Sequence, residues 1–264
     1  MQLITTVIPA KDEEKNIDRC LKSVKWCDKI IVMWMGSDKT GEIAKKMGVG
    51  VIEMNKGKKD DFIAVQKNIN WVIDNCKTDW ILRIDADEVV TPELEKEIKL
   101  IVENSKSKIE NSPVAYGIPR QQFFLGDFLR GGDWAYDRLV RLFKPKFARY
   151  EPLVAVHEQF KVNGKIGYLK NSLLHYSHPT LKDLLKKFDI YTTAEVSNLK
   201  ETYISAFLKM IFLPPYIFAR WMIWHNGWKD GIRGIVAGAF RGYYDLLLYS
   251  KFLKQNTIIN KNNV

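Results

Sequence analysis

Hydrophobic and polar positions follow two different periods along the first hundred residues. Mainly apolar runs without helical spacing occupy residues 3–9, 29–34, 49–54 and 79–85, and after each run apolar residues recur every three or four positions. A continuous apolar run is typical of a strand covered on both faces, and the longer spacing is typical of a helix packed on one side. The pattern therefore predicts a Rossmann-like α/β domain with a mainly parallel sheet flanked by helices.

A polar stretch after Lys106 ends this alternation. The strand-like runs that follow are shorter, at residues 114–120, 138–144, 160–164 and 172–177. They predict a mixed, partly antiparallel extension of the same sheet. From Leu181 onward the pattern is helical. We therefore expect one α/β domain over residues 1–180, whose pattern changes at about residue 105, followed by a C-terminal amphipathic helical region over 181–264.

Composition narrows the class of protein. The 264 residues are 46% apolar, enough for a core, and their 27% charged content excludes a multi-span membrane protein. A net charge of +10 predicts an anionic partner. The three cysteines form no CxxC pair, so we expect no zinc or redox motif, and their sparse number fits a reducing compartment. The first apolar run is short and has no basic leader, so it is interpreted as a strand and not as a signal peptide.

Two aspartates end the fourth apolar run. In "WILRIDADE", Asp85 and Asp87 stand one residue apart, with Glu88 directly after them. Ligands of open α/β sheets bind beyond the carboxyl ends of the strands, and a divalent cation relieves the repulsion between neighbouring carboxylates. Mg²⁺ is often held by one or two carboxylates together with substrate phosphates. An isolated pair of this kind is equally typical of a solvated loop before a helix, here one that starts at Thr91-Pro92.

An ordered series of motifs favours the metal. From residue 3 to about residue 180 the chain contains "VIPAKDEEKNIDRCLKSVKW", "GSDKTGEIAKKMG", "AVQKNIN", "WILRIDADEVVTPEL", "RGGDWAYDRLVRLFK", "VAVHEQF" and "LLHYSHP". In this order they resemble the family 2 glycosyltransferases of the GT-A fold. The subgroup most similar adds glucose or a similar sugar to the inner core of bacterial lipopolysaccharide.

The resemblance implies that residues 1–180 form the catalytic domain, with a nucleotide-binding half of about 1–105 and an acceptor half of about 106–180. It also implies a role for several residues in binding the donor. Pro9, Lys11 and Glu13 would contact the base end of a nucleotide, and Lys67 would face the diphosphate. A charged helix start and a solvated helical lysine are the alternatives for these positions.

One position departs from the subgroup. The second-strand signature normally contains an acid that helps to hold the base or ribose, and Trp34 stands where that acid is expected. Asp38 is the candidate substitute. The departure leaves the identity of the donor open, and it also leaves open a weakened enzyme.

The same resemblance implies a cation of Mg²⁺ or Mn²⁺. Asp87 would bind it directly, Asp85 would contact the ribose or a metal-bound water, and His175 would supply an imidazole ligand, which suits manganese-like ions. A core histidine is the alternative for His175.

Catalysis and acceptor binding are expected from the later motifs. Glu158 would be the base that accepts the proton of the acceptor hydroxyl, with His157 beside it to orient it or to contact the donor, and transfer would invert the anomeric centre. Gly132, Trp134 and Asp137 would line the acceptor pocket. A His-Glu pair at a sheet edge and plain packing of Trp134 are the alternatives.

The last third is rich in aromatic and basic residues. Residues 203–254 contain 13 of the chain's 32 aromatic residues, and seven lysines and arginines against two aspartates. Lys209, Arg220 and Pro214-Pro215 interrupt the most apolar segment, so we expect no clean transmembrane span. Amphipathic helices with such residues suit a membrane–water interface. We therefore expect a cytoplasmic protein that lies peripherally on the inner face of the cytoplasmic membrane. Helices that cover the sheet, or a dimer interface, are the alternative.

These observations predict a metal-dependent glycosyltransferase. It would move a sugar from a nucleotide-sugar, UDP-glucose or similar, to the lipopolysaccharide core or another lipid-linked glycan. A nucleotidyltransferase is one alternative, although "IPAKDEE" lacks the glycine-rich loop usual for that class. Another is a membrane-associated binding or scaffold protein with a degraded donor site. A nucleic-acid partner is not expected, because no recognised binding module is present.

Overall fold

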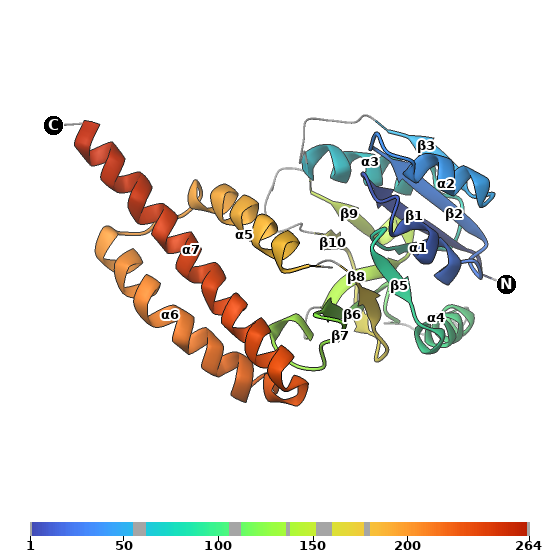
Figure 1. Ribbon diagram of the computed structural model, residues 1–264. Coiled ribbons are helices and arrows are strands. Elements are labelled where there is room, and N and C mark those ends of the chain that lie inside the picture. Colours follow the sequence, from blue (N-terminus) through green and yellow to red (C-terminus); the bar gives the residue numbers. More distant parts are fainter. Residues whose placement is uncertain are drawn as a thin grey trace. The chain divides into compact units, whose positions relative to one another are not determined.

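The computed structural model of the chain describes residues 2–54, 62–105, 112–135, 138–151, 160–176 and 180–262. Contacts group the chain into two compact units (Figure 1). Unit 1 comprises Met1–Arg120 and Arg138–His175, and unit 2 comprises Gln121–Asp137 and Tyr176–Val264. Residues 121–137 thus group with the C-terminal helices. The expected division into a catalytic domain and a membrane-associating region concerns function and stays a prediction.

Unit 1 is built on a mixed sheet. Four parallel strands come in the order β3 (Gly50–Glu53), β2 (Lys29–Trp34), β1 (Ile4–Ala10) and β4 (Trp80–Arg83). The sheet continues antiparallel through β8 (Arg138–Phe143) and β6 (Ala115–Phe124), and then through β12 (Leu173–His175) and β5 (Glu88–Val90). Two short strands, β11 (Ile166–Tyr168) and β7 (Asp127–Phe128), also pair with β6, while β9 (Ala148–Tyr150) and β10 (Phe160–Val162) pair only with each other. The predicted fold class is confirmed.

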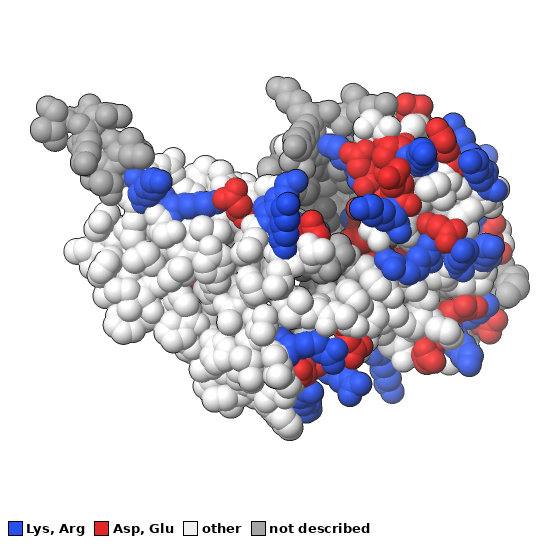
Figure 2. Space-filling model, in the orientation of Figure 1, with Lys and Arg blue, Asp and Glu red and all other residues white. Residues whose placement is uncertain are grey.

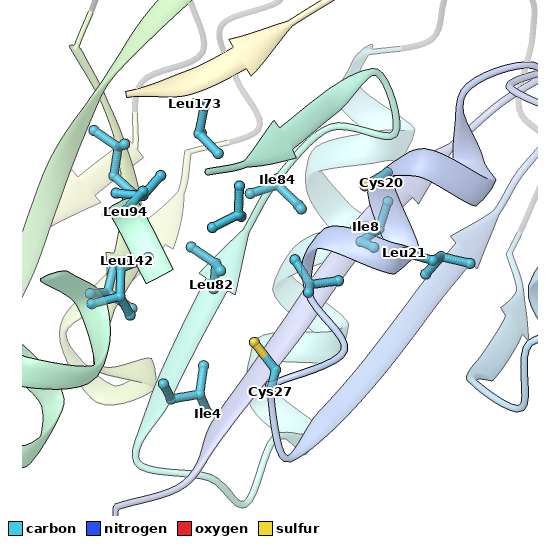
Figure 3. Close-up of a cluster of buried hydrophobic side chains, with 14 of the residues drawn as sticks. Ile4, Ile8, Cys20, Leu21, Cys27, Leu82, Ile84, Leu94, Leu142 and Leu173 are labelled. Carbon is cyan, nitrogen blue, oxygen red and sulfur yellow. The ribbon is translucent and has the colours of Figure 1, made fainter. Parts of the chain in front are cut away.

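Helices cover both faces of this sheet, which explains the continuous apolar strands. Neighbouring residues of β1 and β4 enter different cores: Ile8 and Leu82 pack in one cluster, Val7 and Ile81 in the other. Figure 3 shows the first cluster, to which α1 (Ile17–Ser23), α2 (Thr40–Lys46) and α4 (Pro92–Asn104) contribute. Apolar side chains of α3 (Phe62–Asn75) pack in the second cluster.

The start of α4 follows the predicted signals. The Oγ1 atom of Thr91 accepts a hydrogen bond from the backbone N–H of Leu94 at 3.2 Å, and Pro92 occupies the first turn. Because such a cap satisfies one of the free N–H groups of a helix start, it fixes where the helix begins after the acidic segment.

Unit 2 consists mainly of three helices: α5 (Leu181–Val196), α6 (Tyr203–Ile223) and α7 (Ile232–Asn262). Trp221 of α6 is fully buried, in a cluster with Phe124, Leu184 and Phe188. The helices α6 and α7 approach closely, since a Cβ atom at Gly242 would lie 2.9 Å from the carbonyl oxygen of Pro214.

The predicted interruption of the apolar segment is wrong. Helix α6 runs without a break through Pro214 and Pro215. Its two cations are paired, Lys209 with Glu201 and Arg220 with Asp133. With 21 residues and a mean hydropathy of 1.3, α6 is long and apolar enough to cross a membrane by length and composition.

Candidate active site

Three loops with predicted site residues meet at one edge of the sheet. The strands β1, β2 and β4 run parallel, with Ala10 beside Trp34 and Val7 beside Arg83. Their carboxyl ends therefore lie at the same edge, where open α/β sheets bind ligands. This edge brings the segments after Pro9, after Trp34 and after Arg83 together.

Acidic side chains hold the first two loops against each other. Asp12 accepts a hydrogen bond from the N–H of Ser37 at 2.8 Å, and Asp38 accepts from the N–H groups of Glu14 at 2.9 Å and of Thr40 at 3.0 Å. Desolvation opposes the effect, but the hydrogen bonds from Thr40 and Glu14 lower the pKa of Asp38 below its ordinary value. Asp38 is thus an ionised acid at the expected edge, and it already organises the loop.

The other residues expected at the donor lie nearby on the same edge or on α3. Pro9 is buried within β1, and Lys11 is exposed directly after this strand. The backbone N–H of Glu13 donates to Oγ1 of Thr40 at 2.9 Å. Lys67 is exposed on α3.

Trp34 has a packing role. A Cβ atom at Gly41 would lie 2.6 Å from the indole ring of Trp34, so the ring lies directly on the first turn of α2. The ring thus covers the start of α2 at the position where the subgroup has an acid.

The acids after β4 form a closed turn. The N–H of Glu88 donates to the carbonyl of Asp85 at 3.0 Å, and the carboxylate of Glu88 accepts from the N–H of Asp85 at 2.8 Å. These two bonds fix the four residues from Asp85 to Glu88. Asp87, the third residue of this turn, is thereby held in one orientation.

Three arginines surround two of these acids. Arg83 contacts both carboxylate oxygens of Asp85, at 3.0 and 3.1 Å. The Nη2 atom of Arg141 lies 2.5 Å from Asp85 and 2.9 Å from Glu88. Arg120 reaches Glu88 at 3.4 Å. The oxygens of Asp85 therefore already accept from guanidinium groups, although its side chain remains 30% exposed.

Glu88 is completely buried. Desolvation and the neighbouring Asp85 carboxylate raise its pKa to about 8, against the opposing effect of Arg120 and Arg83. This position does not suit a metal ligand, since both carboxyl oxygens of Glu88 accept from groups of the protein.

Asp87 and His175 form the pair best suited to a cation. The Oδ2 atom of Asp87 lies 3.2 Å from Nε2 of His175, and both side chains are largely buried. Their proximity follows from the pairing of β12 with β5, which sets His175 opposite Glu88. Adjacent ligands of an octahedral ion with metal–ligand distances of about 2.1 Å are separated by about 3 Å, so the two groups fit neighbouring positions on one cation.

Among the residues that the structure describes, no three His, Cys, Asp or Glu side chains are arranged so that together they could hold a metal ion. The Nδ1 atom of His175 is buried and has no hydrogen-bond partner in this part of the chain. Two protein ligands with phosphate oxygens and water are a usual arrangement for Mg²⁺. The residues present therefore fit a cation that is bound together with a phosphorylated substrate.

Several expected residues lie outside the described part of the chain. These are the expected base Glu158, its neighbour His157, and the expected acceptor residue Asp137.

The expected acceptor residues Gly132 and Trp134 belong to unit 2. Gly132 has φ +80°, and a Cβ atom there would lie 2.1 Å from the ring of Trp221. The N–H of Gly131 donates to Asp230 at 2.9 Å, and that of Gly132 donates to the carbonyl of His225 at 2.8 Å. A Cβ atom at Gly131 would lie 2.3 Å from the carbonyl oxygen of Asn226, so close packing against Trp221 and this backbone accounts for the glycine pair without a substrate.

Trp134 lies at a cavity of unit 2. Its ring meets that of Trp221 edge-on, with centroids 5.1 Å apart. The cavity has a volume of about 310 Å³, and aromatic and charged side chains line it: Trp134, Lys187, Phe188, Tyr191, Glu195, Arg241 and Tyr244. Aromatic faces beside charged groups are suited to a polar ligand with an apolar side, such as a sugar ring.

Sequence reasoning missed the arginines around the acids. Arg83 and Arg141 each stand within an apolar strand, in "WILRID" and "RLVRLF". A charged residue in a buried strand requires a partner of opposite charge, so the sequence could have predicted an acidic partner for each of these arginines. The sequence did not reveal that they share one set of acids.

Comparison with known proteins identifies the family. The family model described as glycosyl transferase family 2 matches residues 5–173. An uncharacterized glycosyltransferase of Rickettsia typhi is 30% identical over 209 residues, which cover 75% of this chain and 68% of the relative. The lipopolysaccharide core biosynthesis glycosyltransferase LpsC of Rhizobium meliloti is 24% identical over 271 residues, covering 99% and 96%.

Solved structures with similarity include TarS of S. aureus. Its fragment 1–349 in complex with UDP is 12% identical with a TM-score of 0.48, covering 94% of this chain and 91% of the fragment. The chain spans 46% of the longer TarS chain. By the family model, which matches well over half of its length, the chain belongs to glycosyl transferase family 2.

Proposed function

We propose that the protein transfers a sugar, with inversion and with the help of Mg²⁺ or Mn²⁺, from a UDP-sugar such as UDP-glucose to the lipopolysaccharide core or another lipid-linked glycan. The observation that carries this proposal is the Asp87–His175 pair, 3.2 Å apart at the carboxyl edge of the sheet. The similarity to LpsC over nearly the whole chain supports the acceptor class.

The donor would bind along this edge. Pro9, Lys11 and Glu13 hold the base, with Asp38 in place of the acid that Trp34 replaces. Lys67 faces the diphosphate as a compact positive charge. Asp85, whose oxygens already accept from arginines, contacts the ribose or a metal-bound water through its exposed side.

Asp87 and His175 hold the cation at the diphosphate. When bound, the cation supplies positive charge that stabilises the departing nucleotide. The partial burial of both side chains strengthens their hold on a charged ligand, because water competes less for them. Glu158 accepts the proton of the acceptor hydroxyl as this oxygen attacks the anomeric carbon, and His157 orients Glu158. We expect Glu158→Gln to bind the donor but to lose transfer, and full turnover of this variant would contradict the base assignment.

The acceptor would reach Trp134 in unit 2, and Gly132 and Asp137 would also take part in binding it. The aromatic and charged lining of the cavity at Trp134 supports this role. Trp134→Ala should raise the KM for the acceptor and leave donor affinity unchanged.

A peripheral position on the inner face of the cytoplasmic membrane is supported by unit 2. Along α6, an unbroken stripe of apolar side chains is 44–73% exposed: Ile204, Phe207, Leu208, Ile211, Phe212 and Tyr216. Only 17% of the most apolar window of this helix is buried. Figure 2 shows hardly any charged side chain on the visible face over α6 and α7.

The stripe continues around the turn into α7. Trp224, Trp228 and Ile232 are 67%, 60% and 80% exposed. Large exposed apolar patches mark interaction sites, and Trp residues at such a surface favour the membrane interface. The protein would thus lie on the membrane that contains its lipid-linked acceptor. Flotation with anionic vesicles at low and high salt tests this, and a protein that never co-floats would overturn it.

Calorimetric titration with UDP, GDP and CDP, each with and without Mn²⁺, tests the donor assignment. We expect binding of UDP that is strengthened by Mn²⁺. Binding of no nucleotide would favour the second candidate, a membrane-associated scaffold with a degraded donor site. The observation behind this candidate is the Trp34 ring on α2, at the position of an acid.

A further inference from the structure

We propose that Arg141 is a positioning residue for the metal site: by tying Asp85 to Glu88 it fixes the turn that presents Asp87, and it keeps Asp85 out of direct contact with the cation. This inference rests on the proposed function, since it concerns the same site. Arg141 lies in the motif "RGGDWAYDRLVRLFK", and the family resemblance implies no role for it.

A β-bulge aims Arg141 at the acids. On β6 and β8, Tyr116 pairs with Leu142 and the next residue, Gly117, pairs with Val140. Arg141 is thus the extra residue of β8. A bulge re-aims a side chain, and bulges are frequent beside active sites. Without this extra residue, side chains along β8 would simply alternate between the two faces of the sheet, and this alternation would set the direction of the Arg141 side chain.

The neighbouring strand explains why the acids are needed. On β4 and β8, Ile81 pairs with Phe143 and Leu82 with Leu142. Continued by one residue, this register sets Arg83 opposite Arg141. Two like charges opposite each other in a sheet repel, and both side chains are at most 5% exposed. The Asp85 carboxylate contacts both arginines and offsets this cost.

Arg141 bridges the acids with a single nitrogen. Its Nη2 atom contacts Asp85 at 2.5 Å and Glu88 at 2.9 Å, and its side chain is 1% exposed. Glu88 in turn accepts from the backbone of Asp85. The first and last residues of the turn are therefore held at the backbone and at the side chains. Asp87, between them, faces His175 at 3.2 Å.

Lysine at this position tests the bridge. Arg141→Lys keeps the charge, but an ammonium group lacks the planar, fixed donors of a guanidinium and cannot reproduce the contact with both acids. Loss of a group that orients metal ligands typically lowers metal affinity about 10- to 100-fold. We expect Arg141→Lys to weaken UDP binding in Mn²⁺ by that factor, and to leave UDP binding in EDTA unchanged.

A second variant guards against misfolding. Arg141→Met combined with Glu88→Gln removes a buried charge pair as a unit, which is tolerated better than removal of one partner. It should show the same loss in Mn²⁺ only. The exposed ion pair of Arg149 with Asp74 provides a control, and Arg149→Lys should change neither titration.

The readouts separate the possible failures. Circular dichroism checks that each variant is folded, and the broadening of the His175 imidazole resonance by Mn²⁺ alone reports the metal without nucleotide. If the wild-type protein shows no effect of Mn²⁺ in either experiment, the metal site and the bridge both fail. If the wild-type protein responds and Arg141→Lys responds equally, or loses UDP affinity equally in EDTA, only the role of Arg141 is overturned.

Discussion

Unit 1 and unit 2 break the usual distribution of residues in opposite ways. Unit 1 buries ionisable groups: Arg83, Arg141 and Glu88 lie within its sheet, at most 5% exposed. Unit 2 exposes apolar surface: Phe212 and Ile232 are 64% and 80% exposed. Both arrangements cost free energy in water. We infer that each is kept for a ligand, a cation with its diphosphate in unit 1 and a lipid surface in unit 2.

The two units also treat their cations differently. In unit 1 the arginines share acids at the edge where the donor would bind. In unit 2, Arg220 and His225 both contact Asp133, His225 at 3.2 Å, away from the exposed stripe of α6. Pairing of Lys209 with Glu201 likewise leaves that stripe without charge. Arginines are thus paired within the buried sheet in unit 1, and cations are paired at partly exposed side chains in unit 2.

Loss of the Asp87 carboxylate should have the largest effect. Asp87→Asn keeps the shape of the side chain but removes the negative charge that would hold the cation. We expect kcat to fall at least about 1,000-fold, which corresponds to about 4 kcal/mol of transition-state stabilisation. Release of UDP from UDP-glucose measures this. Asp74→Asn changes an exposed acid of the same unit, 57% exposed, and should leave kcat unchanged.

The buried carboxyl group of Glu88 in unit 1 should make the free energy of unfolding depend on pH. Burial and Asp85 raise the pKa of Glu88 to about 8 from an ordinary value of 4.5. The folded protein therefore keeps this proton where the unfolded chain has lost it, and the stabilisation, complete below pH 4.5, declines as pH rises toward 8. Because one pKa unit corresponds to about 1.4 kcal/mol, the decline amounts to at most about 5 kcal/mol.

Urea unfolding at a series of pH values from 5 to 8.5 measures this decline. Glu88→Gln cannot ionise, so its unfolding free energy should vary much less over the same range. An equal slope in both proteins would show that another group is responsible.

Replacement of Gly132 by alanine should lower the stability of unit 2. Alanine there requires a positive φ and brings Cβ to within 2.1 Å of the Trp221 ring. The left-handed conformation costs about 1–2 kcal/mol, and overpacking adds about 1–3 kcal/mol. Gly126, with φ +91° and nothing within 4 Å of a Cβ atom, is a matched control. Gly126→Ala should lose only the conformational part, and equal melting temperatures for the two variants would refute the packing role.

A charge on the stripe of α6 should reduce membrane binding. Burial of an isoleucine side chain is worth about 1.5–3 kcal/mol, so Ile211→Glu should lower partition into anionic vesicles about 10- to 100-fold. Leu100 of α4 in unit 1 is 60% exposed and apolar, but it lies outside this stripe. Leu100→Glu should therefore partition like the wild-type protein. Equal losses in both variants would mean that the stripe is not the lipid-facing surface.

The predictable part of unit 1 came from short-range patterns. Neighbouring residues such as Val7 and Ile8 enter opposite cores, so a strand covered on both faces is visible in the sequence. The position of Asp87 just after a strand could likewise be predicted, because the apolar run of that strand ends just before it. The bridge by Arg141 could not be predicted, because it depends on a bulge and on the register of two strands far apart in sequence.

The helices of unit 2 were predicted, but not which side they bury. The stripe through Phe207 and Ile211 has the spacing of a core face, yet it is exposed, while Trp221 on the other side is fully buried. The apolar residues of α7 are divided between surface and core, with Ile235 exposed and Phe240 packed in the core of unit 2. Periodicity gives the spacing of a face, and only the packing of neighbouring helices decides whether that face is covered.

Pulsed electron paramagnetic resonance of the complex with Mn²⁺ and UDP tests the central claim most directly. We expect nuclear coupling to ³¹P from the diphosphate and to ¹⁴N from the imidazole of His175, with the nitrogen signal lost in His175→Asn. A Mn²⁺–UDP complex without nitrogen coupling, or with coupling unchanged in His175→Asn, would contradict the assignment of Asp87 and His175 to the cation.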